Sequence, residues 1–307
     1  MKILFLESCE WEYDYIVSDI FENKLEVELF NAQNIFSLMH RKDLIRDNIF
    51  CINPAIKLDV VEKVVQFLNP IVIFWFSDED GRHNNWTKLA LYTKFLFRNY
   101  NHPSYNYLSN TAQIPLGYVT GFLLDKSVPL YRKIGYVNNG VQSYNAIRPK
   151  MVDRKISASF VGQLKSDRHE MCSIFINMKN NMIVPVDNNW NIQKLQFLPA
   201  DLFKLYSDSI FVLIGRGNIS LDCFRIYEAI VAGAIPVIVG DNKEISDTFA
   251  YNGYKPKFIQ ADTWNNAYNI CAELLLDKDA LQTFQDANIT WWNFQIEFIR
   301  NKICDLL

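Results

Sequence analysis

The sequence predicts an α/β protein with two Rossmann-like domains that face each other across a cleft. The chain has 307 residues, of which 50% are hydrophobic and 14% aromatic, enough apolar material for two cores of ordinary size. Short β-rich runs alternate with amphipathic stretches in both halves, the pattern of parallel sheets covered by helices. A segment without periodicity separates the halves and contains Asn138-Asn139-Gly140 and Arg148-Pro149. We place the domain boundary near Lys150.

The first domain is predicted to span residues 1–150. Its strands are runs of β-branched, leucine and aromatic residues, and its helices have apolar residues at helical spacing. In chain order we expect a strand at Lys2–Leu6, a helix at Tyr13–Phe21, a strand at Leu25–Phe30, a helix at Leu58–Leu68 and a strand at Ile71–Phe76.

The second domain is predicted to span residues 151–285, where the alternation starts again. The expected strands are Ser157–Val161, Met182–Val186, Ile210–Ile214 and Ile235–Val239, and the expected helices are Arg168–Met178, Pro199–Tyr206 and Phe224–Ala232, with further helices after Asp262. Apolar residues at Trp292, Ile296, Ile299 and Ile303 predict a last helix at Trp291–Ile303. We expect this final segment, residues 286–307, to pack back across both domains.

Charge and composition exclude several classes of partner and location. Lys and Arg number 31 against 34 Asp and Glu, so no long-range positive field favours nucleic acid, and an anionic ligand must be held locally. The longest apolar stretch, Ile71–Phe76, is strand-sized, and the N-terminal apolar run is too short for a signal peptide. Six widely spaced cysteines favour reduced core thiols over a zinc site. We therefore expect a soluble, cytoplasmic protein without a membrane span.

The most informative segment runs from Phe211 to Asp241. It predicts a buried strand, a polar loop with two glycines, a helix that begins near Asp222, and a second buried strand. Ligands of open α/β sheets bind beyond the carboxyl ends of the strands, where this loop lies. Arg225 in the first helical turn suits a diphosphate, and Glu228 one turn later suits ribose hydroxyls. A surface Arg–Glu pair is the alternative interpretation.

A second strand supports the same interpretation. Ser159–Gly162 is a strand that ends in glycine, which permits close approach of a ligand to the backbone. The following loop leads to Arg168 at the start of a helix, where its side chain can meet a phosphate; an ordinary strand-to-helix loop is the alternative. The candidate donor-binding residues are Gly162, Arg168, Arg216, Ser220, Asp222, Arg225 and Glu228.

Together these residues resemble the exostosin-type glycosyltransferases, family 47 and its relatives. The matching elements are Phe160-Val161-Gly162 with Arg168, and Ser220, Arg225, Glu228-Ala229, Gly233 and Ile235-Pro236-Val237. Two further stretches, Phe97–Tyr100 and Ile114–Tyr118, resemble the branch that contains xylosyltransferases. The resemblance implies a GT-B fold and inverting transfer of a sugar from a UDP-sugar, UDP-xylose first, to a hydroxyl of a glycan acceptor. Exostosins are typically membrane-anchored, and a sequence without an anchor points to a microbial or viral enzyme.

Inverting transfer needs a general base for the acceptor hydroxyl. The residues after Ile71–Phe76 include three candidates, in order Asp78, Glu79 and His83. The carboxylates of this segment are crowded, so each would raise the pKa of the others. A solvated acidic turn is the alternative interpretation. A rival acidic cluster follows the first strand and contains Glu7, Glu10, Glu12 and Asp14. We expect Arg98 and Glu10 on the acceptor side.

Two competing functions remain open at this stage. An apolar strand followed by Asp78-Glu79-Asp80 fits the metal motif of single-domain, metal-dependent GT-A glycosyltransferases. The donor-type residues about 150 positions downstream favour GT-B instead, in which arginines and a helix N-terminus neutralise the diphosphate and no metal or other cofactor is required. Retaining GT-B enzymes often have a second glutamate eight positions after the first, and here Pro236 occupies that position relative to Glu228. The other alternative is a non-catalytic nucleotide-sugar-binding module.

Overall fold

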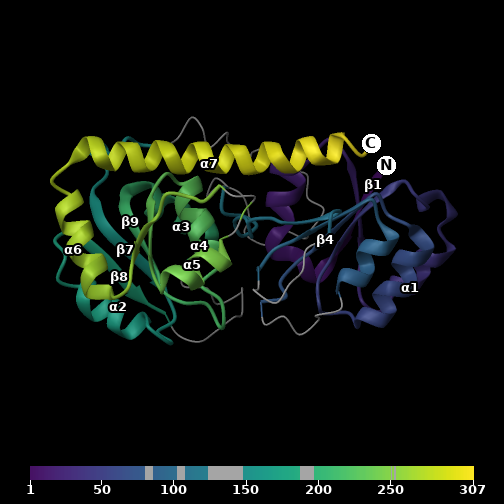
Figure 1. The fold of residues 1–307 in the computed structure, drawn as a ribbon, viewed down its shortest axis with the longest axis horizontal. Coiled ribbons are helices and arrows are strands. Elements are labelled where there is room, and N and C mark those ends of the chain that lie inside the picture. The colour runs from purple at the N-terminus through teal and green to yellow at the C-terminus, as the bar shows by residue number, and fades with distance from the viewer. Residues whose placement is uncertain (80–85, 102–107, 124–147, 187–196, 250, 252–253) are drawn as a thin grey trace.

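Two parallel β-sheets lie side by side in the computed structural model, and one long helix crosses both (Figure 1). The structure describes residues 1–79, 86–101, 108–123, 148–186, 197–249, 251 and 254–307. The first sheet lies between residues 2 and 113 and the second between residues 156 and 261, and we call these the first and second domains. The predicted boundary at Lys150 lies between the two sheets.

The first domain has six parallel strands in the order β2-β1-β3-β4-β5-β6. The strands are β1 (Lys2–Leu6), β2 (Glu26–Phe30), β3 (Asn48–Ile52), β4 (Val72–Trp75), β5 (Phe95–Arg98) and β6 (Thr111–Gln113). Its helical segments are α1 (Leu58–Leu68) and the short 3₁₀ or π segments η1 (Glu7–Glu12), η2 (Tyr15–Ile20), η3 (Ile35–His40), η4 (Lys42–Leu44) and η5 (Trp86–Tyr92). The helix expected at Tyr13–Phe21 is confirmed, with a π-helical segment over Tyr15–Ile20. Three strands, β3, β5 and β6, were missed because short apolar runs do not distinguish strand from helix.

The second domain has five parallel strands in the order β11-β10-β9-β7-β8. They are β7 (Ile156–Gly162), β8 (Asn181–Pro185), β9 (Ser209–Ile214), β10 (Ile235–Val239) and β11 (Ile259–Ala261). The helical segments are η7 (Met151–Asp153), α2 (Arg168–Phe175), α3 (Pro199–Asp208), α4 (Phe224–Val231), α5 (Asn242–Thr248), α6 (Trp264–Leu274) and α7 (Lys278–Cys304). The four predicted strands and three predicted helices are confirmed with small shifts at their ends. No described helix is both long and apolar enough to cross a lipid bilayer.

Helices cover both faces of the second sheet because its strands are apolar on both sides. Successive side chains of a strand point to opposite faces. Phe160 accordingly joins a core that includes Phe175 of α2 and Trp264 of α6, while its neighbour Val161 joins the core that contains Tyr206 of α3. The second of these cores continues into the first domain, so the two domains share one buried cluster.

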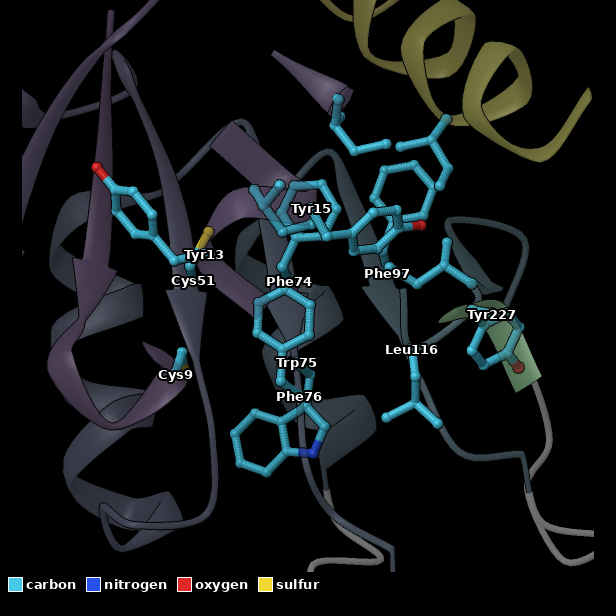
Figure 2. Packing of buried hydrophobic residues seen from close by; sticks show 14 of the residues in the cluster. Cys9, Tyr13, Tyr15, Cys51, Phe74, Trp75, Phe76, Phe97, Leu116 and Tyr227 are labelled. Carbon is cyan, nitrogen blue, oxygen red and sulfur yellow. The ribbon is translucent and has the colours of Figure 1, made fainter. Parts of the chain in front are cut away.

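An aromatic seam joins the domains. Trp292 of α7 is fully buried, and its ring centroid lies 5.6 Å from that of Tyr15 in the first domain and 6.1 Å from that of Tyr227 in the second. Figure 2 shows Tyr15 and Tyr227 in this shared cluster. Farther along α7, Arg300 donates to the carbonyl of Asp19 at 2.9 Å. The last helix therefore begins in the second domain and packs across both, and it starts 13 residues before the predicted Trp291.

A buried arginine fixes the entry into the second domain. Arg154 donates hydrogen bonds to the carbonyls of Tyr206, Ser209, Ala232 and Pro149 at 2.6–3.3 Å. Burial lowers the pKa of this guanidinium to about 9. Four backbone carbonyls accept hydrogen bonds from the two Nη atoms of Arg154, so its function is structural.

Trp292→Ala tests the aromatic seam. Loss of a fully buried indole that touches both domains should lower the free energy of unfolding by about 3–5 kcal/mol. Urea unfolding followed by tryptophan fluorescence and circular dichroism measures this change. Phe294→Ala is the matched control, because Phe294 lies on the same helix with 44% of its surface exposed and should change stability by less than about 1 kcal/mol. Equal effects of the two substitutions would argue against the seam.

Candidate functional site

The carboxyl ends of strands from both sheets meet between the domains. The loop after β4 contacts the loop after β9, because the side chain of Glu79 accepts hydrogen bonds from residues 218–220. Three non-glycine residues at strand ends or in the loops that follow have left-handed backbone, Ser77 after β4, Tyr100 after β5 and Ser166 after β7, with φ of 56°, 55° and 51°. Such strained positions cluster at functional sites. Both observations locate the candidate site at the boundary between the domains, where the sequence predicts the cleft.

Two arginines of the second domain lie together in the cleft without a carboxylate partner among the described residues. Arg168 is buried and Arg225 half-buried, and their guanidinium carbons lie 5.9 Å and 5.0 Å from the ring centroid of Phe160. Each has a buried Nε atom without a hydrogen-bond partner. Burial, and then the charge of Arg225, lower the pKa of Arg168 to about 10. Arg168 donates to the carbonyls of Gln163 and Gly215, but two adjacent guanidinium groups without an ion pair favour an anion between them.

Glycines bring these arginines close to the strand ends. A Cβ atom on Gly162 would lie 2.8 Å from Nη2 of Arg225, and one on Gly215 would lie 2.3 Å from Cγ of Arg168. The Nη2 atom of Arg225 donates to the carbonyl of Val161 at 3.0 Å, at the end of β7. Any larger residue at either glycine would displace an arginine from the cleft.

Glu228 lies on α4, one turn after Arg225. It is 4% exposed, and burial raises the pKa of its carboxyl to about 7 against the opposing effect of Arg225. One carboxylate oxygen accepts a hydrogen bond from the backbone N–H of Val119 at 3.4 Å, across the domain boundary. Glu228 therefore lies between the arginine pair and the first domain.

Three other predicted donor residues shape the loop after β9. Arg216 forms a bidentate ion pair with Glu244. The Oγ atom of Ser220 accepts from the N–H of Asp222 at 3.0 Å, and the buried carboxylate of Asp222 accepts from the hydroxyl of Tyr227 at 2.6 Å. Burial raises the pKa of Asp222 to about 7. These three side chains are bound to protein groups, so direct donor contact by them stays a prediction.

In the first domain, Asp78 and Arg98 form a buried ion pair. Both are at most 1% exposed, and Nη1 of Arg98 lies 3.0 Å from Oδ2 of Asp78. Nη2 of Arg98 donates to the carbonyl of Asp78 at 3.1 Å, and its guanidinium lies 5.1 Å from the ring centroid of Trp86. The carboxylate of Asp78 thus has a guanidinium partner, and the expected roles, a base for Asp78 and an acceptor contact for Arg98, stay predictions.

The other expected first-domain residues differ in their surroundings. Glu79 is half-buried, and its carboxylate is bound by three backbone N–H groups of the second domain. Glu10 is exposed on η1. His83 lies outside the described residues, so its place in the cleft stays a prediction.

Glu12 belongs to the rival acidic cluster that follows β1. It is fully buried at the end of η1, and Ser77 Oγ donates to its Oε1 atom at 2.6 Å. Its Oε2 atom has no hydrogen-bond partner, and burial raises its pKa to about 7. The sequence predicted an acidic cluster after β1, but the spacing of its residues did not show that Glu12 is buried whereas Glu7 and Glu10 are exposed.

A short segment connects Glu12 to the donor side. Val119 donates to Glu228, and the N–H of the next residue, Thr120, donates to the carbonyl of Trp11 at 2.9 Å. Glu12 follows Trp11 directly in the chain. Glu12 and Glu228 therefore both lie close to the short segment Val119-Thr120.

The two-sheet architecture corrects the single-domain GT-A alternative. Asp78 is paired with Arg98 and Glu79 with backbone N–H groups, and Asp80 lies outside the described residues. Within the part of the chain that the structure describes, no cluster of three or more His, Cys, Asp or Glu side chains could hold a metal ion.

Comparison with known proteins supports the architecture. The sequence matches no protein-family model and no curated protein. Among solved structures, HepE of Anabaena in complex with UDP is similar with a TM-score of 0.54 and 11% identity over 99% of both chains. HepE with UDP and glucose gives 0.53 and 12% identity, over 99% of this chain and 98% of that one. BGT of phage T4 with UDP and Mn²⁺ covers 100% of this chain and 97% of its own at 10% identity, with a TM-score of 0.44 that adds no weight. The chain has a GT-B fold.

Proposed function

We propose that this protein is a glycosyltransferase that transfers a sugar from a UDP-sugar to a hydroxyl group of a glycan. The observation that carries the proposal is the pair of adjacent arginines, Arg168 and Arg225, which form no ion pair with a carboxylate among the described residues and lie at the strand ends of a GT-B fold. The similarity to HepE, solved in complex with UDP, supports the choice of nucleotide. The exostosin resemblance supports the same activity, and membership of that family stays a prediction.

In this mechanism the second domain binds and activates the donor. Arg168 and Arg225 hold the diphosphate and stabilise the negative charge that grows on UDP as it leaves. Glu228 binds the ribose hydroxyls. With two guanidinium groups at the diphosphate, the proposed reaction requires no metal ion.

The first domain supplies the base, and we assign this role to Glu12. As the acceptor hydroxyl attacks the anomeric carbon, the base accepts its proton and UDP departs, which inverts the configuration. A carboxylate with a free oxygen and a pKa of about 7 suits this task near neutral pH. Asp78 differs from Glu12 because its Oδ2 atom is held in an ion pair with Arg98.

UDP-xylose is the first donor to test. This choice rests on the resemblance of Phe97–Tyr100 and Ile114–Tyr118 to the xylosyltransferase branch. Residues in both stretches, including Phe97 and Leu116, are buried in the core, where they support the fold and cannot select a sugar directly.

A panel of UDP-sugars tests the function itself. We expect UDP and at least one UDP-sugar to raise the melting temperature, because each binds only the folded state. Thermal shift with EDTA and with Mn²⁺, followed by assays of glycan transfer, measures binding and activity separately. Binding without transfer or donor hydrolysis would favour a non-catalytic module, and activity that EDTA abolishes and Mn²⁺ restores would contradict metal-free chemistry.

Arg225→Ala tests the diphosphate site. Loss of one charge-assisted contact should weaken UDP binding by about 1.5–3 kcal/mol, roughly 10- to 150-fold. Isothermal titration calorimetry measures the affinity. Arg41→Ala is the matched control, since Arg41 forms surface ion pairs in the first domain and should leave UDP affinity unchanged. Unchanged affinity in Arg225→Ala would remove the assignment.

Glu12→Gln tests the base. Transfer should fall by about 10²–10⁴-fold with UDP affinity nearly intact, because Gln accepts no proton. Wild-type kcat/KM should rise as pH increases through about 7, where Glu12 ionises.

A raised pKa in the folded state means that Glu12 favours folding at low pH, an advantage lost as pH rises through about 7. Glu12→Gln should therefore raise the free energy of unfolding at pH 8 by about 3 kcal/mol, since the pKa rises from 4.5 to about 7.

Asp78→Asn is the contrasting variant for this test. It removes the carboxylate charge from the buried ion pair with Arg98, so we expect a loss of stability of about 3–5 kcal/mol. At temperatures where the variant is folded, transfer should continue. A folded Asp78→Asn protein without transfer, beside an active Glu12→Gln protein, would return the role of base to Asp78.

A further inference from the structure

A carboxylate from the first domain occupies an anion-binding loop of the second. Oε1 of Glu79 accepts hydrogen bonds from the backbone N–H groups of Asn218, Ile219 and Ser220 at 2.9, 2.9 and 3.0 Å. Oε2 lies 3.4 Å from the side-chain amide nitrogen of Asn218. Successive N–H groups that converge on one oxygen form a nest, a backbone arrangement that binds phosphate and carboxylate anions. We call residues 218–220 the nest.

The surroundings of the nest are positively charged. The Nζ atom of Lys165 donates to the side-chain oxygen of Asn218. Lys165 interacts electrostatically with Arg168, Arg225 and Glu79, so the nest adjoins the arginine pair. Gly217 is required beside it, because a Cβ atom there would lie 2.7 Å from Oε1 of Glu79. The nest and the basic side chains thus form one site for an anion, and Glu79 is the anion that occupies it.

The buried ion pair of the first domain explains how Glu79 is held. Arg98 at the end of β5 binds both the carboxylate and the carbonyl of Asp78, the residue immediately before Glu79. This fixes the backbone from which the Glu79 side chain extends across the cleft. The ion pair therefore positions the carboxylate at the nest.

We propose that Glu79 is a latch between the domains and that it competes with the donor diphosphate for the nest. This inference rests on the proposed function for the identity of the competing ligand. With Glu79 bound, the cleft is closed around a carboxylate of the protein itself. UDP must displace it, so the apparent affinity for UDP is reduced by the fraction of molecules in which the latch is closed.

Substitutions at Glu79 test the latch in the full-length protein. Glu79→Ala removes the carboxylate, and Glu79→Asp keeps the charge but is one methylene too short to reach the nest. Glu297→Ala removes an exposed glutamate from α7 and serves as the matched control. Hydrogen–deuterium exchange of residues 217–220 without ligand measures occupancy of the nest. Isothermal titration calorimetry measures affinity for UDP.

We expect both Glu79 variants to increase exchange at residues 218–220 at least tenfold and to bind UDP at least threefold more tightly, while Glu297→Ala matches the wild type. Added UDP should restore protection in the Glu79 variants. Unchanged exchange in Glu79→Ala would overturn the latch. Increased exchange with equal or weaker UDP binding would overturn the competition. If neither wild type nor variants bind UDP but exchange increases, the latch stands and the proposed donor fails.

Discussion

The packing of one helix against both domains is the constraint on which the site depends. Trp292 of α7 lies between Tyr15 and Tyr227, so burial of a single indole sets the relative position of two sheets. Every proposed step needs groups from both sides of the cleft, with the diphosphate site on the second domain and the base on the first. The apolar packing of Trp292, which does not itself take part in the proposed reaction, therefore brings the diphosphate site and the base together.

Arginines of similar burial have opposite roles because their partners differ. Arg154 donates to four backbone carbonyls and organises the connection between the domains. Arg168 and Arg225 both lie near the ring of Phe160 and form no ion pair with a carboxylate among the described residues. The net charge of −3 does not reveal this distinction. Affinity for an anion arises from local desolvated cations and from oriented backbone N–H groups.

The carboxylates separate into two groups by the same reasoning. Asp78 and Glu79 have strong donors, a guanidinium and the nest respectively, and these interactions give them positioning and latching roles. Glu12 and Glu228 are buried with weaker compensation, and the pKa of each rises to about 7. Groups that ionise near neutral pH can exchange protons with a substrate. In the sequence, by contrast, Asp78 and Glu79 looked the more promising pair because they directly follow an apolar strand.

Local sequence determined much of the second domain. The strand, glycine, arginine and helix pattern around Gly162 and Gly215 requires close backbone approach, and chain-local chemistry was enough to predict the elements and the arginine pair. The short strands β3, β5 and β6 could not be predicted, since pairing with neighbouring strands decides them. Only the tertiary structure decided which donor each carboxylate binds. Asp78 binds Arg98, Glu79 binds the nest at residues 218–220 and Glu12 binds Ser77, and each of these donors is distant in the chain from its acid. The sequence by itself therefore determined which residue types lie near the site, and long-range contacts determined which protein group each charged side chain binds.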